Sequence, residues 1–491
     1  MNLSTVPICV IGAGTMGRGI AQIAVAAGHQ VSLIDPDARQ LSAAKDEIGA
    51  RLSKRDPDAA QTVSRGLGLY QNLPEAPAHP DTVVVEAVLE DLDVKQSVLR
   101  QAAEHFGPSC ALATNTSSLS VTAIGAGVPD PSRTVGMHFF NPVPVMKLVE
   151  VVRGLQTDDA VVGLITELAE HWGKTVAHVR STPGFIVNRV ARGFYGEALR
   201  CLEEGAAAPE TIDATVRAAG GFRMGPFELM DLIGNDVNSA VTRTVWTAYN
   251  FDPRFAPSQH QGELVAAGRL GRKTGHGFYD YREGAERPSP TPFAASPTED
   301  EPELILHGAD AQLETFLERA GASYARSAAG SWAARLELVG HGFVMVTRGR
   351  TAAEESRRLG AATVVLDRTL DTATVSALAI ASPDTALTGL VAQLMEQAAI
   401  RTYVVKDLPA LLLARILAVI ANEAYETAHH GVATPTDIDL AMRLGTNYPL
   451  GPFEWTSLWS PALVVTLLDA LWDAYHDPRY RVSQALRAVV V

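Results

Sequence analysis

The segment Ile8-Cys9-Val10-Ile11-Gly12-Ala13-Gly14-Thr15-Met16-Gly17 joins a short apolar run to a turn with three glycines. A helix is expected from Met16 to Ala27, ended by Gly28, and a second strand from Val31 to Ile34. In such a unit the glycines allow a tight turn, close approach of a pyrophosphate, and close helix–strand packing. The helix N-terminus offers free N–H groups to phosphates. The segment predicts a dinucleotide-binding Rossmann unit; a glycine turn without a ligand is the alternative.

The residue that ends the second strand distinguishes NAD from NADP. Asp35 holds that position, 18 residues after Gly17. A carboxylate there accepts hydrogen bonds from the ribose hydroxyls and repels a 2′-phosphate. We therefore expect NAD as the cofactor. The loop residues assigned to it are Gly12, Gly14, Thr15, Met16 and Gly17, together with Asp35.

Strands and helices continue to alternate beyond this unit, which is typical of a doubly wound, mostly parallel sheet. Further strands are expected at Thr82 to Ala87, Ala111 to Thr114, Val135 to Phe139 and Leu148 to Val152. Helical periodicity then dominates, and a Pro- and Ser-rich linker precedes a small α/β unit that has no glycine fingerprint. The expected segments are a Rossmann domain (1–182), a helical substrate or dimerisation domain (183–282), a linker (283–303), an α/β unit of unassigned role (304–402) and a second helical domain (403–491).

The second helical domain repeats the first at a constant offset of 226 positions. The Asp252-Pro253-Arg254-Phe255 string also recurs, as Asp477-Pro478-Arg479-Tyr480. An ungapped offset of this kind indicates a duplicated all-α domain. The matched residues are Pro183, Arg189, Glu197, Gly205, Pro209, Ile212, Asp213 and Gly225-Pro226-Phe227-Glu228, with Pro409, Arg415, Glu423, Gly431, Pro435, Ile438, Asp439 and Gly451-Pro452-Phe453-Glu454.

Composition excludes several classes of protein. With 47% hydrophobic and 20% charged residues, the chain is expected to be globular, and its net charge of −14 disfavours nucleic acid as a partner. Neither a signal peptide nor an apolar run long enough for a bilayer is visible, so we expect a cytoplasmic protein without a membrane partner. Cys9, Cys110 and Cys201 are scattered, which predicts neither a disulfide framework nor a metal site.

His138 and Glu150 form the strongest catalytic candidate. They lie in two expected neighbouring strands, joined by the loop that contains Asn141-Pro142-Val143-Pro144. If the strands pair, a carboxylate bonded to the imidazole fixes its tautomer and stabilises the imidazolium, as removal of an alcohol proton requires. Spacing alone favours the alternative, a purely structural histidine, because a lone histidine near an apolar run more often has that role.

Three weaker candidates each keep a structural alternative. Asn115-Thr116-Ser117-Ser118 follows a strand and is either part of a ligand crevice or the cap of a helix from Leu119 to Ile124. Asn188 begins a long helix and is either functional or on a solvated face. Arg51, Lys54 and Arg55 either bind the 3′-phosphate of a coenzyme A or are simply solvated.

The sequence resembles the L-3-hydroxyacyl-CoA dehydrogenase family from residue 6 to residue 282. The long string around His138 is highly specific. The strings that carry the resemblance are Val10-Ile-Gly-Ala-Gly-Thr-Met-Gly17, Glu86-Ala-Val-Leu-Glu90 with Lys95, Asn115-Thr-Ser-Ser-Leu119, Gly136-Met-His-Phe-Phe-Asn-Pro-Val-Pro-Val-Met-Lys-Leu-Val-Glu150, Pro183-Gly-Phe-Ile-Val-Asn-Arg189, Gly225-Pro-Phe-Glu-Leu229 and Gly271-Arg-Lys-Thr-Gly275.

The resemblance implies NAD-dependent oxidation of an L-3-hydroxyacyl-CoA to the 3-oxoacyl-CoA. His138 would be the base and Glu150 its partner, while Ser117 and Asn188 would hold the substrate. Further contacts to the cofactor are implied for Glu90, Lys95, Asn115, Ser117, Asn141 and Lys273. The alternatives are a dehydrogenase of a free hydroxy acid and a noncatalytic NAD-binding structural protein; a hydratase or lyase is disfavoured because no second catalytic set is visible.

The extra C-terminal length is similar to long bacterial members of the family, including those of phenylacetate or adipate-type catabolism that act on 3-hydroxyadipyl-CoA. The second helical copy has Ala414 where the first has Asn188, and it ends before any counterpart of Lys273. We therefore expect it to be structural. Single-copy members dimerise through this domain, so the chain is expected to form a homodimer or, within one chain, a pseudo-dimer.

Overall fold

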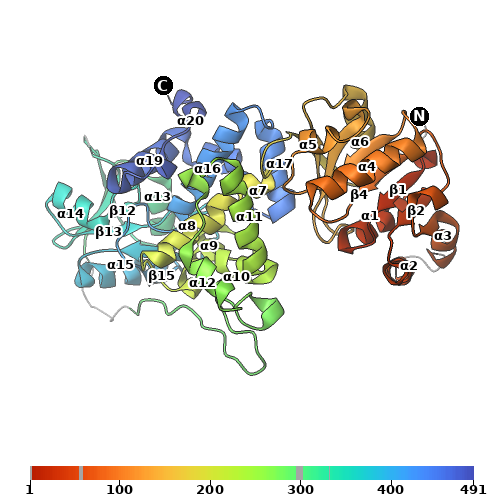
Figure 1. The fold of residues 1–491 in the computed structure, drawn as a ribbon. Helices are drawn as coiled ribbons and strands as arrows, with labels where there is room; N and C mark the ends of the chain where they lie inside the picture. The colour runs from red at the N-terminus through yellow and green to blue at the C-terminus, as the bar shows by residue number, and fades with distance from the viewer. Residues whose placement is uncertain (1–2, 55–58, 295–301, 331, 491) are drawn as a thin grey trace. The chain divides into compact units, whose positions relative to one another are not determined.

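A computed structural model describes residues 3–54, 59–294, 302–330 and 332–490 of the chain. The chain forms two compact units, one of Met1–Arg189 with His430–Thr446 and the other of Val190–His429 with Asn447–Val491 (Figure 1). The predicted fold class is confirmed: a Rossmann sheet, a helical domain, a second α/β unit and a second helical domain follow one another. Arg55 and residues 295–301 of the predicted linker lie outside the described residues.

The first unit contains an eight-stranded sheet in the order β3-β2-β1-β4-β5-β6-β7-β8. Neighbouring strands run parallel except for the antiparallel pair β6–β7. The strands are β1 (Ile8–Ile11), β2 (Val31–Ile34), β3 (Leu67–Tyr70), β4 (Val83–Glu86), β5 (Ala111–Thr114), β6 (Thr134–Phe139), β7 (Leu148–Arg153) and β8 (Thr175–Arg180). Of these, β3 and β8 were not predicted.

Helices cover both faces of this sheet because its buried strands are apolar on both sides. Val10 and Val85 pack with α1, α2 and α6 on one face, whereas Cys9 and Val84 pack with α4 and α5 on the other. The helices are α1 (Thr15–Ala26), α2 (Ala38–Ser53), α3 (Ala59–Gly66), α4 (Leu92–Phe106), α5 (Val121–Gly125), α6 (Asp159–His171) and α7 (Val187–Val190).

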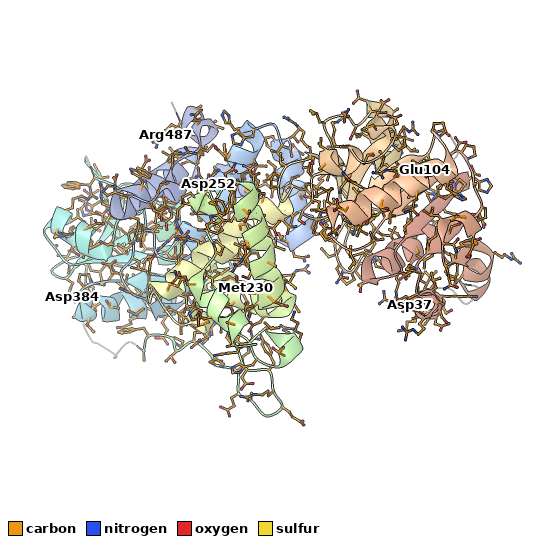
Figure 2. The ribbon with its side chains drawn as sticks, viewed as in Figure 1. Asp37, Glu104, Met230, Asp252, Asp384 and Arg487 are labelled. Carbon is orange, nitrogen blue, oxygen red and sulfur yellow. The ribbon has the colours of Figure 1, made fainter. Side chains whose placement is uncertain are left out.

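Side-chain caps begin many of these helices. Asp37, labelled in Figure 2, accepts from the N–H of Arg39 at the start of α2, which satisfies a donor that the helix itself cannot bond. Ser120 caps α5 in the same way, so the helix begins at Val121. The expectation that residues 115–118 cap a helix beginning at Leu119 is therefore wrong.

A helix from the far end of the sequence completes the first unit. Helix α17 (Pro435–Thr446) packs on β7 and β8, and β8 is the edge strand of the sheet. The N–H of His178 donates to Asp437 Oδ1 at 3.2 Å, and the N–H of Arg180 donates to the carbonyl of Val432 at 2.8 Å. These bonds occupy donors that an uncovered edge would expose.

The second unit contains the remaining helices and a second sheet, coloured from yellow-green to blue in Figure 1. Its helices are α8 (Arg192–Glu203), α9 (Pro209–Gly220), α10 (Pro226–Ile233), α11 (Asn235–Ala248), α12 (Gln259–Ala266), α13 (Ala311–Ala320), α14 (Ala352–Leu359), α15 (Thr385–Gln397), α16 (Leu413–His429), α18 (Pro452–Trp459), α19 (Pro461–Tyr475) and α20 (Gln484–Ala488). No helix in the described ranges is long and apolar enough to cross a membrane.

The second sheet has seven strands in the order β10-β9-β11-β12-β13-β14-β15. The series β12–β15 pairs parallel, antiparallel and parallel, as β5–β8 does in the first sheet. The duplication thus includes part of the sheet as well as the helices. The strands are β9 (Leu304–His307), β10 (Ala325–Ser327), β11 (Arg335–Leu338), β12 (Gly342–Val346), β13 (Thr363–Leu366), β14 (Ala377–Ala381) and β15 (Arg401–Val404).

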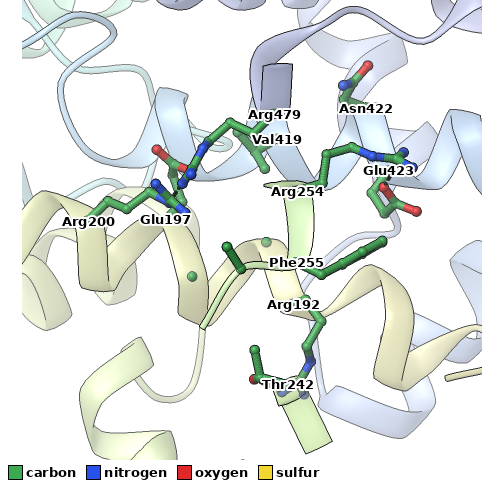
Figure 3. A pocket seen from close by; sticks show the side chains of 13 residues that line it. Arg192, Glu197, Arg200, Thr242, Arg254, Phe255, Val419, Asn422, Glu423 and Arg479 are labelled. Atoms are coloured by element: carbon green, nitrogen blue, oxygen red, sulfur yellow. Dashed lines mark hydrogen bonds and ion pairs between the residues drawn. The ribbon is translucent and has the colours of Figure 1, made fainter. Parts of the chain in front are cut away.

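The two helical copies meet where α8 packs on α16. Arg415 Nε lies 2.6 Å from Glu197 Oε1, and Arg254 Nη1 lies 2.9 Å from Glu423 Oε2. Glu197 and Glu423 are equivalent residues in the repeat, so each copy presents the same carboxylate to an arginine of the other. A small pocket beside these helices is lined by four arginines and both glutamates (Figure 3).

Candidate active site

The glycine loop has the geometry that a dinucleotide requires. Gly12 adopts a φ of +103°, a region that favours glycine, and a Cβ there would lie 2.6 Å from the carbonyl oxygen of Ala87. A Cβ on Gly17 would lie 1.8 Å from the carbonyl oxygen of Gly12. A Cβ on Gly14, in contrast, would meet nothing within 4 Å. The loop is thus packed where helix meets strand and open beside Gly14, at the start of α1, as a bound pyrophosphate requires.

Asp35 lies directly after β2 and is tied to this loop. Its Oδ2 accepts from the N–H of Ala13 at 2.8 Å, and its Oδ1 accepts from the N–H of Asp37 at 2.9 Å. Each carboxylate oxygen has a second lone pair, so both can still accept from ribose hydroxyls. The loop and Asp35 therefore fit NAD.

His138 and Glu150 are brought together as predicted from their strands. They lie directly opposite one another on β6 and β7. His138 Nδ1 is 2.6 Å from Glu150 Oε2, and because a carboxylate only accepts, Nδ1–H is the donor. This bond leaves Nε2 as the ring nitrogen that is able to accept a proton. The rings of Phe140 and Phe185 lie 4.6 and 5.6 Å from the imidazole, between centroids.

Glu150 is fully buried, and its other oxygen is also bonded. Oε1 accepts from the N–H groups of Ile186 and Val187, each at 3.1 Å, at the start of α7. The preceding residues Gly184 and Phe185 have φ values of +76° and +49°, and this left-handed turn directs the two N–H groups at the carboxylate. A left-handed phenylalanine is strained, and such strain is retained where the surrounding structure requires it.

The second copy has an equivalent left-handed turn, but no counterpart of the His138–Glu150 pair accompanies it among the described residues. Ala410 and Leu411, equivalent to Gly184 and Phe185, have φ values of +60° and +54°. The N–H groups that follow, on Leu412 and Leu413, bind Asp367 Oδ2 at 3.1 and 2.7 Å. Asp367 follows β13, the counterpart of β6, so a carboxylate without a histidine partner takes the place of Glu150.

Ser117 lies in a turn that Glu90 holds in place. Glu90 Oε1 accepts from Thr116 Oγ1 at 2.6 Å and from the N–H of Ser117 at 3.0 Å. Burial opposes the charge of Glu90, but these hydrogen bonds and the nearby Lys95 outweigh it and lower the pKa of the carboxyl group. The turn follows β5, at the same carboxyl edge of the sheet as His138.

The structure gives Lys95 and Asn115 protein partners. Lys95 is buried, and its Nζ lies 2.7 Å from Glu86 Oε1 and 3.3 Å from Glu90 Oε2. Asn115 Oδ1 accepts from the N–H of Phe139 at 2.9 Å, which links the ends of β5 and β6 beside His138.

The other predicted residues are more scattered. Asn188 is half-buried in the short helix α7, immediately after the N–H groups that bind Glu150, and Asn141 is exposed in the loop between β6 and β7. The predicted long helix at Asn188 is divided, because α7 ends at Val190 and α8 begins at Arg192. In the second unit, Lys273 Nζ pairs with Asp236 Oδ1 at 2.6 Å.

The basic cluster is only partly described. Arg51 is exposed on α2 and pairs with Glu47, and Lys54 is exposed at the C-terminus of the same helix. Arg55 lies outside the described residues.

Several residues beside the site were not identified from the sequence. Phe140 and Phe185 lie within the motifs already quoted. Their place in those motifs, with Phe140 two residues after His138, is the sequence feature that could have identified them. Lys174 Nζ donates to the carbonyls of Val143 and Met146 in the loop after β6. Burial lowers the pKa of Lys174 to about 8.

Comparisons with protein families cover most of the chain. Residues 7–182 match the family described as 3-hydroxyacyl-CoA dehydrogenase, NAD binding domain. Residues 184–281 and 412–491 both match 3-hydroxyacyl-CoA dehydrogenase, C-terminal domain, which confirms the predicted duplication. Residues 344–411 match 3-hydroxybutyryl-CoA dehydrogenase reduced Rossmann-fold domain.

Individual relatives agree with these matches. A 3-hydroxyadipyl-CoA dehydrogenase of Escherichia coli K12 is 42% identical over 99% of this chain and 98% of its own length. A probable 3-hydroxybutyryl-CoA dehydrogenase of Bacillus subtilis is 40% identical over 56% of this chain and 97% of its own. The crystal structure of a 3-hydroxybutyryl-CoA dehydrogenase from Escherichia coli K12 has a TM-score of 0.89 at 40% identity, covering 99% of this chain and 98% of that one.

Proposed function

The chain belongs to the 3-hydroxyacyl-CoA dehydrogenase family, and from this premise we propose that it oxidises an L-3-hydroxyacyl-CoA to the 3-oxoacyl-CoA with NAD. The observation that carries the proposal is the bond of 2.6 Å between His138 and Glu150 at the carboxyl edge of the sheet that bears the glycine loop. In doubly wound sheets, ligands bind at this edge.

His138 acts as the general base. Its Nε2 takes the proton of the 3-hydroxyl group, while Nδ1–H remains bonded to Glu150. The buried carboxylate of Glu150 stabilises the imidazolium that forms, and the N–H groups of Ile186 and Val187 keep that carboxylate in place. NAD, when bound, supplies the acceptor for the hydride.

The neighbouring residues hold the reactants. Ser117 and Asn188 position the oxygens of the substrate. NAD is held by the loop that contains Gly12 and Gly14 and by Asp35. We assign to the margin of the cofactor site the residues Glu90, Lys95, Asn115, Asn141 and Lys273, and to the coenzyme A phosphates the exposed side chains Arg51 and Lys54.

The test of the base is His138→Gln. This variant is expected to bind NADH as the wild type does but to lose about 10²- to 10⁴-fold in kcat for reduction of acetoacetyl-CoA, the range attributed to general acid–base catalysis. Free acetoacetate is the matched control substrate. Near-normal turnover by the variant would remove His138 from the mechanism, and equal turnover of the free acid would favour a dehydrogenase of hydroxy acids.

The acyl group is a separate question, because the names of the full-length relatives differ between adipyl and butyryl thioesters. The two matches are almost equal in identity, at 42% and 40%, and we propose 3-hydroxyadipyl-CoA, the substrate in the name of the relative with 42% identity. Steady-state kcat/KM values for 3-hydroxybutyryl-, 3-hydroxyadipyl- and longer 3-hydroxyacyl-CoA substrates test this choice, and a preference for the butyryl thioester would reject it.

We also propose that the duplicated helices form a pseudo-dimer within one chain. The ion pairs Arg415–Glu197 and Arg254–Glu423 support this proposal, since each copy offers an equivalent carboxylate to an arginine of the other. The chain is then expected to sediment as a monomer of 52.3 kDa. A stable dimer in sedimentation velocity, or a truncated chain without residues 400–491 that stays monomeric and active, would contradict the proposal.

A further inference from the structure

Helix α17 comes from the second helical copy, yet it is part of the unit that holds the first copy's candidate site. At its N-terminal end, Asp437 binds the edge strand β8, and Val432, which precedes the helix, binds the same strand. Its C-terminal end therefore has a fixed position against the sheet.

Gly445 lies at that C-terminal end, beside side chains that surround the catalytic candidates. A Cβ at this position would lie 2.8 Å from Leu148 Cδ2, 2.9 Å from Val187 Cγ2 and 3.7 Å from Phe140 Cε1. Distances below 3.0 Å force a displacement. The Leu148 side chain can move Cδ2 by turning about its χ2 bond, whereas Val187 is β-branched and stiff.

Two of these neighbours contact the His138–Glu150 pair directly. The N–H of Val187 donates to Glu150 Oε1 at 3.1 Å, and the ring of Phe140 lies 4.6 Å from the imidazole of His138. A shift of Val187 away from Gly445 would therefore alter the hydrogen bond that orients the carboxylate.

The reciprocal arrangement occurs in the second unit. Ala219, the residue equivalent to Gly445, lies in the last turn of α9, and its carbonyl accepts from Thr369 Oγ1 at 2.7 Å and from the N–H of Leu370 at 2.9 Å. These residues follow Asp367, which binds the N–H groups of the repeated turn. Each copy thus places the same helix end against the sheet of the other copy, so the contact at Gly445 is part of the architecture.

We propose that Gly445, contributed by the second copy, is a positioning residue for the His138–Glu150 pair of the first. The absence of a side chain at this position lets Val187 and Phe140 keep the places from which they fix the carboxylate and the imidazole. This inference rests on the proposed function, because it assigns Gly445 to that same site.

The test compares Gly445→Ala with Gly389→Ala, a glycine in helix α15 where a Cβ would meet nothing within 4 Å. We expect Gly445→Ala to lower kcat for acetoacetyl-CoA reduction by about tenfold to a hundredfold, since misplacement by about 1 Å can cost 10²-fold. NADH affinity should not change. In the oxidation direction, the rise of kcat with pH should move to lower pH, because a weakened bond to Glu150 stabilises the imidazolium less.

A second change provides relief of the contact. Val187→Ala removes Cγ2 but keeps the N–H that binds Glu150. In the Val187→Ala background, adding Gly445→Ala should therefore lower kcat much less than Gly445→Ala lowers it in the wild type. If Gly445→Ala is insoluble, Asp437→Ala, which loosens α17 at its other end, should produce the same direction of pH shift.

The outcomes separate the two proposals. A pH profile of Gly445→Ala equal to that of Gly389→Ala, or a loss of kcat that only follows a loss of folded protein, would overturn the role of Gly445. If Gly445→Ala is insoluble and Asp437→Ala has the pH profile of the wild type, the positioning role of Gly445 is also rejected. A wild-type chain inactive on acetoacetyl-CoA would instead reject the proposed function.

Discussion

Replacement of Glu150 by glutamine tests the site most directly, because it exchanges one atom of a buried side chain. Oε1 accepts from the N–H groups of Ile186 and Val187, so the amide oxygen of the new side chain must stay there. Its NH₂ group then faces His138 Nδ1 and acts as a donor. Nδ1 becomes an acceptor, and the imidazole proton moves to Nε2, the atom that must receive the substrate's proton.

The size of the effect follows from two contributions. Loss of a hydrogen bond to a charged group costs about 1.5–3 kcal/mol, or roughly 10- to 150-fold in rate at about 1.4 kcal/mol per factor of ten. The unfavourable tautomer removes the base as well, so we expect kcat to fall by about 10²- to 10⁴-fold in Glu150→Gln. The KM for acetoacetyl-CoA should change little, because Glu150 is fully buried.

The assay is steady-state oxidation of NADH by acetoacetyl-CoA, followed by absorbance, with NADH affinity measured separately. Glu150→Ala is the companion variant: it leaves two buried N–H groups without an acceptor, at about 1–3 kcal/mol each, and should melt at a lower temperature than Glu150→Gln. A kcat for Glu150→Gln within about threefold of the wild type, which is under 1 kcal/mol, would refute this account of the pair.

Three further outcomes are expected. Arg415→Met removes the nearer of the two arginines paired with the buried Glu197, leaving only Arg200 at 3.8 Å, and should lower the free energy of unfolding by about 3–5 kcal/mol in urea. The exposed pair lost in the control Arg487→Met should contribute under about 1 kcal/mol. Burial raises the pKa of Asp213 to about 7, so the folded chain holds more protons than the unfolded one between about pH 4 and 7 and loses stability as pH rises through that window. Asp213→Asn should therefore show a flatter dependence of Tm on pH, and a Tm profile parallel to that of the wild type would contradict this. Asp35→Ala should raise the KM for NADH by about 10-fold or more and reduce the enzyme's preference for NADH over NADPH. If the ratio of kcat/KM for NADH to kcat/KM for NADPH is unchanged, Asp35 has no part in cofactor selection.

The glycine loop and the meeting of His138 with Glu150 could be predicted because both depend on local spacing, whereas the catalytic role of His138 was implied by the family resemblance. Glycines at fixed intervals after an apolar run allow few other structures, and two neighbouring strands that pair bring facing residues together. The edge strands were harder to see. β8 (Thr175–Arg180) exposes His178 and Arg180 and so lacks a continuous apolar run, and β3 contains Gly68.

The interactions that hold the His138–Glu150 pair in place could not be predicted from the sequence, for a physical reason. Backbone N–H groups such as those of Ile186 and Val187 are present at every residue and leave no mark in the sequence. The contact of Gly445 with Val187 joins segments that are distant along the chain, and a single glycine at a helix end has many possible causes. The same limit applies to Asp367, whose bonds to a repeated turn are visible only in the folded chain.

The cover that α17 provides for β8 has a consequence for biosynthesis. Arg180 and the carbonyl of His430 that it contacts are separated by 250 residues. At about 5–20 residues per second, a ribosome needs roughly 12–50 s to synthesise that interval. Throughout this time the nascent sheet has an unpaired border that other chains can join. We therefore expect this protein to engage chaperones during translation.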